Sequence, residues 1–327
     1  MINVERLYNL EDKFKRYSGW SGADGVFSFY YNDQFVWYFS DTFIGESNQQ
    51  DQRLSFELIN NSLAISNLTL EEFKFIYKTN PLASVFIPKE GYFWLQDGFI
   101  EEDKLMIYAL RMKNDIFSNE IFKICGISLL EVNLNFKEGI SYHEHEILNS
   151  SDDFVIGTAI LKEDYYYLFN YKNENGNKKL FLARTKSLLD NKFEYLKNDG
   201  TWDYSKDNLM ILKDHFAAEF TVFKTKDFYY IAYTKESLGK DIYLLKIENL
   251  FKPYNQEILL YSCPEHQGNI ITYNSKIQKG LSNQEELIIS YNVNSLVNED
   301  HKNLDIYRPR FLKVKVEDIE NEFKKNK

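Results

Sequence analysis

The stretch QDGFIEEDKLMIYALRMK, from Gln96 to Lys113, joins a short apolar strand, a polar turn and a longer aromatic strand. Four other stretches repeat this layout: ADGVFSFYYNDQFVWYFSDT from Ala23, IGTAILKEDYYYLFNYKN from Ile156, AEFTVFKTKDFYYIAYTKE from Ala218 and NSKIQKGLSNQEELIISYNVN from Asn274. Each turn is rich in Asn, Asp, Glu, Lys or Gly, as is typical of a β-hairpin. The sequence therefore predicts five β units.

The units follow one another roughly 60 residues apart, a period typical of repeat architectures. Each adds a third alternating strand, and some add a fourth. This pattern predicts an all-β protein, a five-bladed β-propeller, with a β-sandwich or two β domains as the alternative. No Pro/Gly/Ser-rich linker interrupts the chain, so residues 1–327 are expected to form a single domain with short polar extensions at both ends. The predicted blades cover approximately residues 20–80, 90–148, 150–205, 215–262 and 270–316.

Composition excludes several classes of protein. The chain is 44% hydrophobic and 17% aromatic, which supports a packed core rather than disorder. Its net charge of −10 argues against nucleic acid or an anionic membrane as a partner. Two cysteines without pairing or metal spacing, and a charged start without an apolar signal region, predict a cytoplasmic protein. These features leave the oligomeric state open.

Acidic residues recur at one position of the repeat. The equivalent positions of the five units are Asp24, Asp97, Gly157, Glu219 and Asn274. In a propeller the first strand of each blade lines the central channel, so these side chains are expected to converge. Carboxyl groups held together raise one another's pKa, and a pair that differs in protonation is what glycoside hydrolysis needs. The alternative is that each acid caps a strand or binds backbone NH groups at a turn.

Seven motifs carry a resemblance to a known family: GWSGADGVFSF from Gly19, WYFSDTFIG from Trp37, INNS from Ile59, FWLQDGFI from Phe93, AAEFTVF from Ala217, and ITYNSKI with ISYNVNS. Together with YRPRF near the C-terminal end, they resemble a five-bladed propeller family of glycoside-hydrolase-like bacterial domains. That family is related in architecture to arabinanases, fructan-active enzymes and mannoside phosphorylases. The resemblance covers roughly Trp20 to Val314 and implies a carbohydrate or glycoside ligand.

The resemblance also implies catalytic roles. Asp24 would be the general base, Asp97 would tune the pKa of its neighbours and orient substrate, and Glu219 would be the general acid. Arabinanase-type propellers usually have a histidine near the axis that helps to hold a central cation. Asn274 stands there in this chain, which argues against a central Ca²⁺. We accordingly predict no metal site and no cofactor.

Other residues are candidates with less specific signals. Asp41, in the SDT motif, competes for the role of acid or base. Arg53, Arg308 and Arg310 are candidates for binding a phosphate or uronate, and for Arg308 and Arg310 the alternative is a salt bridge between blades. The remaining candidates for sugar contacts are Asn61, Asn274, Asn292, Trp20, Trp94 and His215. Asparagine is also an ordinary turn residue, and tryptophan also packs between blades.

Three functions follow from these observations. Inverting glycoside hydrolysis is favoured, because the acids come from separate blades and an inverting pair is the more widely spaced. Phosphorolysis is the second, with Arg53, Arg308 or Lys276 binding phosphate. A propeller without catalysis that binds a glycan or a protein is the third.

Overall fold

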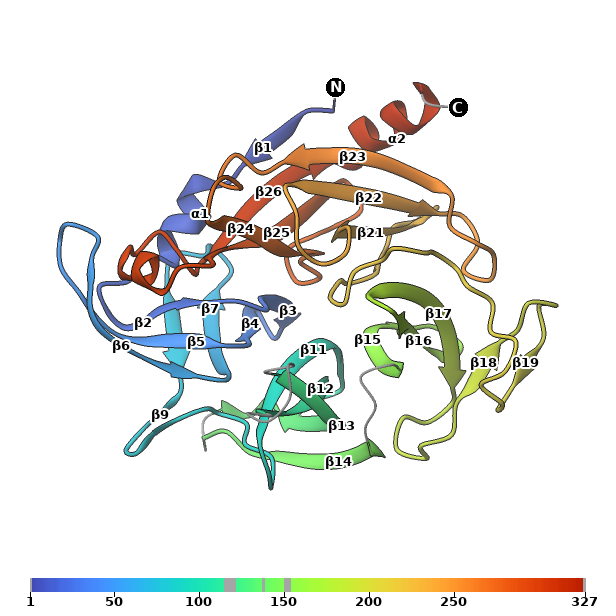
Figure 1. The fold of residues 1–327 in the computed structure, drawn as a ribbon, viewed down its shortest axis with the longest axis horizontal. Coiled ribbons are helices and arrows are strands. Elements are labelled where there is room, and N and C mark those ends of the chain that lie inside the picture. Colours follow the sequence, from blue (N-terminus) through green and yellow to red (C-terminus); the bar gives the residue numbers. More distant parts are fainter. Residues whose placement is uncertain (1, 115–121, 137–138, 150–153, 326–327) are drawn as a thin grey trace.

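A computed structural model describes residues 2–114, 122–136, 139–149 and 154–325. Strands dominate it, which confirms the predicted all-β class. Within these residues, five antiparallel sheets of four or more strands follow one another along the chain. Figure 1 shows them arranged around a central region, with β3, β11 and β15 on its border.

The first sheet has the order β3-β4-β7-β8. Its strands are β3 (Phe27–Tyr31), β4 (Gln34–Phe39), β7 (Ser62–Asn67) and β8 (Phe73–Ile76). Asn32 and Asp33 connect β3 to β4, both with positive φ (47° and 58°). Asn and Asp tolerate this conformation, which lets a two-residue turn follow the twist of the strands. The polar turn of the repeat thus sets the register of this hairpin.

The next three sheets each use consecutive strands. The second sheet is β11 (Tyr92–Glu101), β12 (Lys104–Asn114), β13 (Phe122–Asn133) and β14 (Tyr142–Asn149). The third is β15 (Phe154–Lys162), β16 (Tyr166–Glu174), β17 (Asn177–Thr185), β18 (Glu194–Leu196) and β19 (Trp202–Asp203). The fourth is β20 (Phe223–Lys224), β21 (Tyr229–Thr234), β22 (Asp241–Ile247) and β23 (Gln256–Ser262).

The fifth sheet joins the two ends of the chain. Its order is β24-β25-β26-β1, with β24 (Ile270–Ile277), β25 (Glu286–Ser295), β26 (Pro309–Lys315) and β1 (Val4–Arg6). Val4 pairs with Val314 and Arg6 with Leu312. The sequence predicts a polar extension at the N-terminus, but Ile2 and Val4 pack on the apolar cluster between the fourth and fifth sheets. Burial of these two side chains explains the difference.

Two smaller sheets were not predicted. The side sheet has the order β2-β5-β6, with β2 (Ser18–Ala23), β5 (Thr42–Ser47) and β6 (Arg53–Ile59). β2 directly precedes β3, and β5 with β6 is inserted between β4 and β7. A short pair, β9 (Lys78–Thr79) and β10 (Leu82–Ala83), follows β8. The first predicted unit therefore contributes strands to more than one sheet.

Helical segments lie next to the fifth sheet. They are α1 (Tyr8–Lys13), the 3-10 helix η2 (Asn298–Lys302) and α2 (Val316–Lys325). In α2, Ile319 and Phe323 are buried and four residues apart, so they share one face of the helix. This face covers the end of the same apolar cluster that β1 completes. Figure 1 shows α2 beside β23 and β26.

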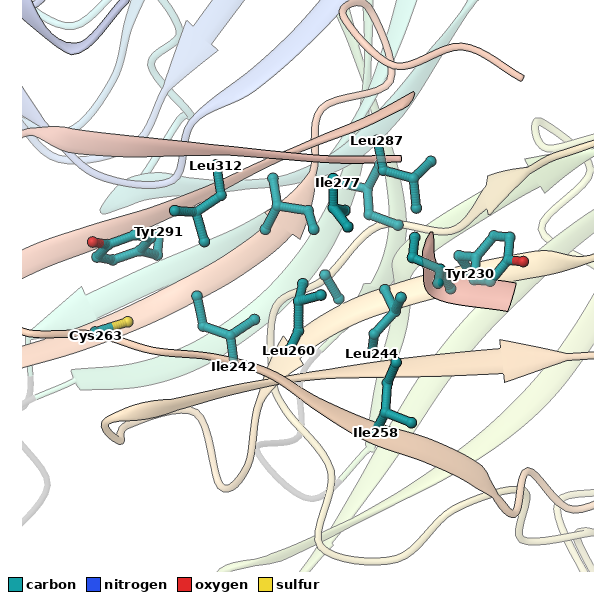
Figure 2. Close-up of a cluster of buried hydrophobic side chains, with 14 of the residues drawn as sticks. Tyr230, Ile242, Leu244, Ile258, Leu260, Cys263, Ile277, Leu287, Tyr291 and Leu312 are labelled. Carbon is teal, nitrogen blue, oxygen red and sulfur yellow. The ribbon is translucent and has the colours of Figure 1, made fainter. Parts of the chain in front are cut away.

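Apolar side chains are buried between successive sheets rather than in one central core. Figure 2 shows this for the fourth and fifth sheets, where Leu244 and Ile258 meet Ile277 and Leu287. Comparable clusters lie between the other neighbours, including one in which Trp37 of the first sheet and Phe311 of the fifth both take part. Each sheet therefore depends on the next for most of its apolar burial. The centre is left to polar side chains.

None of the helices in the described ranges is long and apolar enough to cross a membrane.

Candidate active site

The strands that carry the repeated acidic position have breaks in their pairing at that position. These are the residues that the sequence predicts to lie close together. The pairing of β11 with β12 is interrupted between Leu95 and Gly98, and that of β24 with β25 between Tyr273 and Lys276. β15 has the same interruption between Val155 and Ala159. These gaps contain Asp97, Asn274 and Gly157, and the last two have φ of 56° and 78°. A bulge of this kind re-aims the side chains that it contains.

Three carboxyl groups line one pocket of about 210 Å³. Asp24, Asp41 and Glu219 belong to different parts of the chain, and all three are among the residues that form it. The full lining is Asp24, Ser40, Asp41, Trp94, Ala218, Glu219, Ser237, Leu238, Tyr273 and Asn274. The pocket thus brings together residues of the first, second, fourth and fifth predicted units.

A backbone contact fixes Asp24 against Asp41. The NH of Asp24 donates to the carbonyl of Asp41 (3.1 Å), and the NH of Ser40 donates to the carbonyl of Asp24 (2.9 Å). Gly25 follows with φ of 56°, and a Cβ at that position would meet the Ser40 side chain at 2.5 Å. The glycine of the ADG sequence therefore allows the close approach that sets both aspartates at the pocket.

Asp24 accepts two phenolic hydrogen bonds. The hydroxyl of Tyr273 donates to its Oδ2 at 2.8 Å, and that of Tyr307 donates to the same oxygen at 3.3 Å. Burial raises the pKa of Asp24 well above its usual range, and the charges of Asp41 and Glu219 raise it further. The Tyr273 hydrogen bond opposes this rise. Mutual repulsion of this kind keeps one carboxyl protonated beside an ionised one.

Asp41 lies at the side of the pocket formed by Trp94. Asn60 donates to Asp41 Oδ1 at 3.2 Å, and the Trp94 side chain is a second hydrogen-bond partner. Burial raises the pKa of Asp41 to about 6, against the effect of these two hydrogen bonds. A carboxyl group with such a pKa exchanges protons near neutral pH, as a general acid or base must.

Glu219 has a cationic partner. The ammonium of Lys276, whose side chain is fully buried, lies 3.0 Å from Glu219 Oε2. The same nitrogen is 4.0 Å from the centre of the Phe27 ring. A buried ammonium needs a counter-charge, and the carboxylate of Glu219 supplies it.

Asp97 lies apart from these acids, in a buried ion pair. Its side chain is fully buried, and Oδ2 is 2.5 Å from Lys279 Nζ. The NH groups of Ile160 and Gly98 also donate to its carboxylate. Burial raises the pKa of Asp97, and Lys279 opposes that rise. Asp97 is not among the residues that line the pocket.

The contacts of Lys279 bear on the question of a central cation. Its ammonium also donates to the carbonyls of Ile160 (2.9 Å) and Gly98 (3.2 Å). Carboxylate and carbonyl oxygens are the ligands that Ca²⁺ takes. Here an ammonium already holds them, so these residues do not fit a Ca²⁺ at this point. Among the described residues, no group of three or more His, Cys, Asp or Glu side chains is placed to hold a metal ion.

The three candidate arginines bind backbone carbonyls. Arg53 is buried and donates to the carbonyls of Ser21, His301, Asn303 and Ile306. Arg308 binds the Glu11 carbonyl and the Asp305 carboxylate. Arg310 donates to the Asp305 carbonyl and lies 3.4 Å from Glu265. None of the three lines the pocket.

The other candidate sugar contacts divide in two. Trp94 and Asn274 line the pocket, as predicted for a binding role. Asn292 donates to the carbonyl of Ala23 (3.0 Å) and so steadies the backbone beside Asp24. Asn61, Trp20 and His215 lie elsewhere.

Each of these last three has other partners. Asn61 is fully buried and clamps the backbone of Phe86 through both ends of its amide. Trp20 stacks on Phe75 with ring centres 4.5 Å apart. The exposed His215 lies 3.1 Å from Glu236. Aromatic packing, the alternative given for tryptophan, accounts for the position of Trp20.

Sequence reasoning missed Tyr273 and Tyr307 as partners of Asp24. Tyr273 directly precedes the candidate Asn274, and Tyr307 opens the YRPRF motif that carries part of the resemblance. Tyr307 has φ of 66°, a conformation unusual for a bulky residue. That strain is visible only in the folded chain.

Solved structures share this fold at low sequence identity. A hydrolase candidate from Bacteroides ovatus superposes with a TM-score of 0.76 and 21% identity, over 95% of this chain and 90% of that one. A Bombyx mori GH32 beta-fructofuranosidase gives a TM-score of 0.54 and 11% identity, over 95% of this chain and 62% of that one. A glycoside hydrolase candidate from Parabacteroides distasonis gives a TM-score of 0.51 and 10% identity, over 96% of this chain and 97% of that one. The fold is therefore that of glycoside-hydrolase-like β-propellers.

A search of curated proteins gave no significant match. One family model, described as a domain of unknown function (DUF5005), matches residues 8–318. This range includes every residue that lines the pocket and nearly all of the five sheets. The chain therefore belongs to the DUF5005 family.

Proposed function

We propose that this protein hydrolyses a glycosidic bond in the pocket formed by Asp24, Asp41 and Glu219. The observation that carries the proposal is three carboxyl groups around one cavity with a single buried lysine. Repulsion in such a set keeps one carboxyl protonated and leaves another ionised. An acid and a base facing one substrate are the minimum that glycoside hydrolysis requires.

We further propose that the five sheets are the five blades of one closed propeller domain. Two facts support this. The first and last sheets share an apolar cluster, and β1 from the N-terminus pairs with β26 near the C-terminus. The similarity to the Bombyx mori beta-fructofuranosidase agrees with this architecture at the level of fold. The two free cysteines, Cys125 and Cys263, support the cytoplasm as its compartment.

The contacts favour roles in the opposite order to those expected from the resemblance. Glu219 supplies the counter-charge of the buried Lys276 ammonium, and a carboxylate in this position suits a general base. Burial and repulsion instead favour the protonated forms of Asp24 and Asp41, which suits a general acid. We therefore assign Glu219 as the base that activates water and one of the two aspartates as the acid. Asp97 has a structural role in this scheme, through its ion pair with Lys279.

The substrate that suits this pocket is an uncharged sugar. None of the residues that line the cavity is cationic, so an anionic sugar finds no counter-charge among them, and an ionised carboxylate there repels it. Trp94 offers a face for stacking on a sugar ring, while Asn274 and Ser237 offer hydrogen bonds to hydroxyl groups. Phosphorolysis is less well supported, because Arg53 and Arg308 bind backbone carbonyls and Lys276 is paired with Glu219.

A leaving-group series tests the assignment. Wild-type protein and the variants D24N, D41N and E219Q are assayed on aryl glycosides of uncharged sugars, with phenol leaving groups of graded acidity. Loss of the acid matters little when the phenolate leaves without a proton, whereas loss of the base slows every substrate. We expect E219Q to lose about 100-fold or more in kcat throughout. One of the aspartate variants should keep its activity on the most acidic phenols.

E236Q serves as a control, because Glu236 is exposed and its partner His215 lies outside the pocket. Activity of E219Q on acidic phenols alone would restore the order expected from the resemblance. NMR of the first product formed reports the stereochemistry, and the inverted anomer is expected. Release of sugar phosphate only when phosphate is present would replace hydrolysis by phosphorolysis. Binding of sugars without turnover of any glycoside would overturn the enzymatic proposal.

A further inference from the structure

We infer that His301, Asn294 and Tyr273 form a directional hydrogen-bond chain that leaves Oδ1 of Asp24 as its proton-exchanging oxygen. Asn294 and His301 are positioning residues in this chain, because they act on Asp24 only through Tyr273. The consequence for catalysis rests on the proposed function, whereas the chain itself is a property of the unliganded protein.

The amide of Asn294 has one possible orientation. The backbone NH of Ser295 lies 2.7 Å from Asn294 Oδ1, and an NH group can only donate. The oxygen is therefore on that side. His301 Nε2 lies 2.8 Å from the same oxygen, so it also must carry a proton. The amide nitrogen of Asn294 is left facing the Tyr273 hydroxyl, 3.4 Å away.

This orientation decides where the Tyr273 proton points. Its hydroxyl oxygen accepts from Asn294, so its own proton is free to go to Asp24 Oδ2, 2.8 Å away. Burial and the nearby Asp24 charge raise the pKa of Tyr273 well above its usual range, so the phenol keeps its proton. Tyr307, whose pKa is raised for the same reasons, donates to the same oxygen. Both donors therefore converge on Oδ2.

Asp24 Oδ2 already accepts two hydrogen bonds, so protonation of this oxygen would break at least one of them. When Asp24 is protonated, the proton is held by Oδ1, and when it is ionised, Oδ1 is the oxygen open to a proton from substrate or water. Other charged groups also bear on Asp24: Asp41 and Glu219 repel its charge, and Lys276 attracts it. These charges affect both oxygens of Asp24. The hydrogen-bond chain distinguishes the two oxygens, because it occupies Oδ2 and leaves Oδ1 to exchange the proton.

Arg53 holds the segment that supplies two members of the site. Its guanidinium donates to the carbonyls of His301 (2.7 Å), Asn303 (2.8 Å) and Ile306 (2.9 Å). Tyr307 directly follows Ile306. The arginine that the sequence marks as a candidate for substrate contact thus fixes His301 and Tyr307 instead.

The test is a titration of Asp24 without any substrate. Protein labelled with ¹³C at the Asp carboxyl carbons is titrated by NMR, and D24N identifies the Asp24 signal. Hydrogen bonds that favour the ionised form lower a carboxyl pKa. We expect Y273F to raise the pKa of Asp24 by roughly one pH unit, and N294A to raise it by less. N294A should have no further effect in the Y273F background, because Asn294 acts through that hydroxyl.

Two variants of His301 test whether its NH donor, rather than the size of its side chain, matters for the pKa of Asp24. H301Q keeps an NH donor for Asn294 and is expected to leave the pKa of Asp24 unchanged, whereas H301L is expected to raise it. Y30F is the matched control, since Tyr30 is exposed, its hydroxyl donates to Asp33, and it is not among the residues that line the pocket. If N294A shifted the pKa of Asp24 equally in the wild-type and Y273F backgrounds, the proposed hydrogen-bond chain would be wrong. Absence of glycosidase activity would overturn the proposed function alone, since this titration uses no substrate.

Discussion

The side chain of Lys276 interacts with the charges of two carboxyl groups in the pocket, those of Glu219 and Asp24. It is fully buried, pairs with Glu219 and lies over the Phe27 ring. Its charge also lowers the pKa of Asp24. Removing it takes away the counter-charge of Glu219 and an attraction that lowers the pKa of Asp24.

K276M is accordingly expected to abolish hydrolysis and to lower the free energy of unfolding. Breaking a buried ion pair by removing one partner costs about 3–5 kcal/mol of stability. The double variant K276M/E219Q removes both charges and should recover part of this loss, which urea unfolding at pH 7.5 measures. An equal loss in K276M and in the double variant would show that Lys276 contributes packing rather than charge.

Asp41 gives a second prediction at the scale of one residue. Its pKa of about 6 in the folded protein lies above that of an unfolded chain, so the folded state binds its proton more tightly. The carboxyl therefore imposes no penalty at pH values below its unfolded pKa. It destabilises the fold progressively as the pH rises towards 6. D41N removes this penalty.

We expect D41N to be more stable than wild type at pH 7.5, by on the order of 2 kcal/mol, and equal to it near pH 3.5. Thermal unfolding of both proteins across this range provides the measurement. Lower stability of D41N at pH 7.5 would mean that the Asn60 and Trp94 hydrogen bonds outweigh the burial of the charge.

Strand β1 is the element whose role differs most from the expectation. It looks like a charged extension in the sequence, yet it pairs with β26 and packs on an apolar cluster. V4D places a charge in that contact and is expected to lower the unfolding free energy by roughly 2 kcal/mol. E5Q is the matched control, because the Glu5 side chain is 58% exposed. Equal urea midpoints for V4D and E5Q would show that β1 contributes little.

At the same scale, the sequence predicts most long strands and misses the short or inserted ones. Apolar and aromatic residues mark β12, β16, β22 and β25, because these strands bury side chains along most of their length. The sequence predicts a strand from Ala218 in the fourth unit, but β20 covers only Phe223–Lys224, and the chain bends at Ala218 and Glu219. The β5–β6 insertion has an exposed face, including Leu54 and Leu58, that weakens the alternation on which sequence reasoning depends.

For the site, the sequence could identify acids but not separate Asp97 from Asp41. Both follow aromatic strands, and both are plausible at the centre of a propeller. The distinction comes from Lys279, which is 182 residues from Asp97 in the chain and donates to it in the folded protein. Likewise, Tyr307 reaches Asp24 through a left-handed backbone conformation. Neither contact has a local signature.

For the whole molecule, the Lys279–Asp97 pair joins three sheets. The ammonium extends from the segment after β24 to carbonyls of β11 and β15. K279M leaves a buried unpaired carboxylate and is expected to cost about 3–5 kcal/mol. The double variant K279M/D97N removes both charges, keeps an amide oxygen as an acceptor for the NH groups of Gly98 and Ile160, and should recover most of that loss. Activity per folded molecule is expected to persist in the double variant, and its loss would return Asp97 to the catalytic set.

The pairing of β1 with β26 also constrains the order of events during synthesis. β1 leaves the ribosome before the other described strands, but its partner β26 follows only after the strands of the other four large sheets have been made. Until then Ile2 and Val4 lack part of the apolar cluster on which they pack. The fifth sheet therefore contributes the first of the described strands and is still the last of the five to be completed.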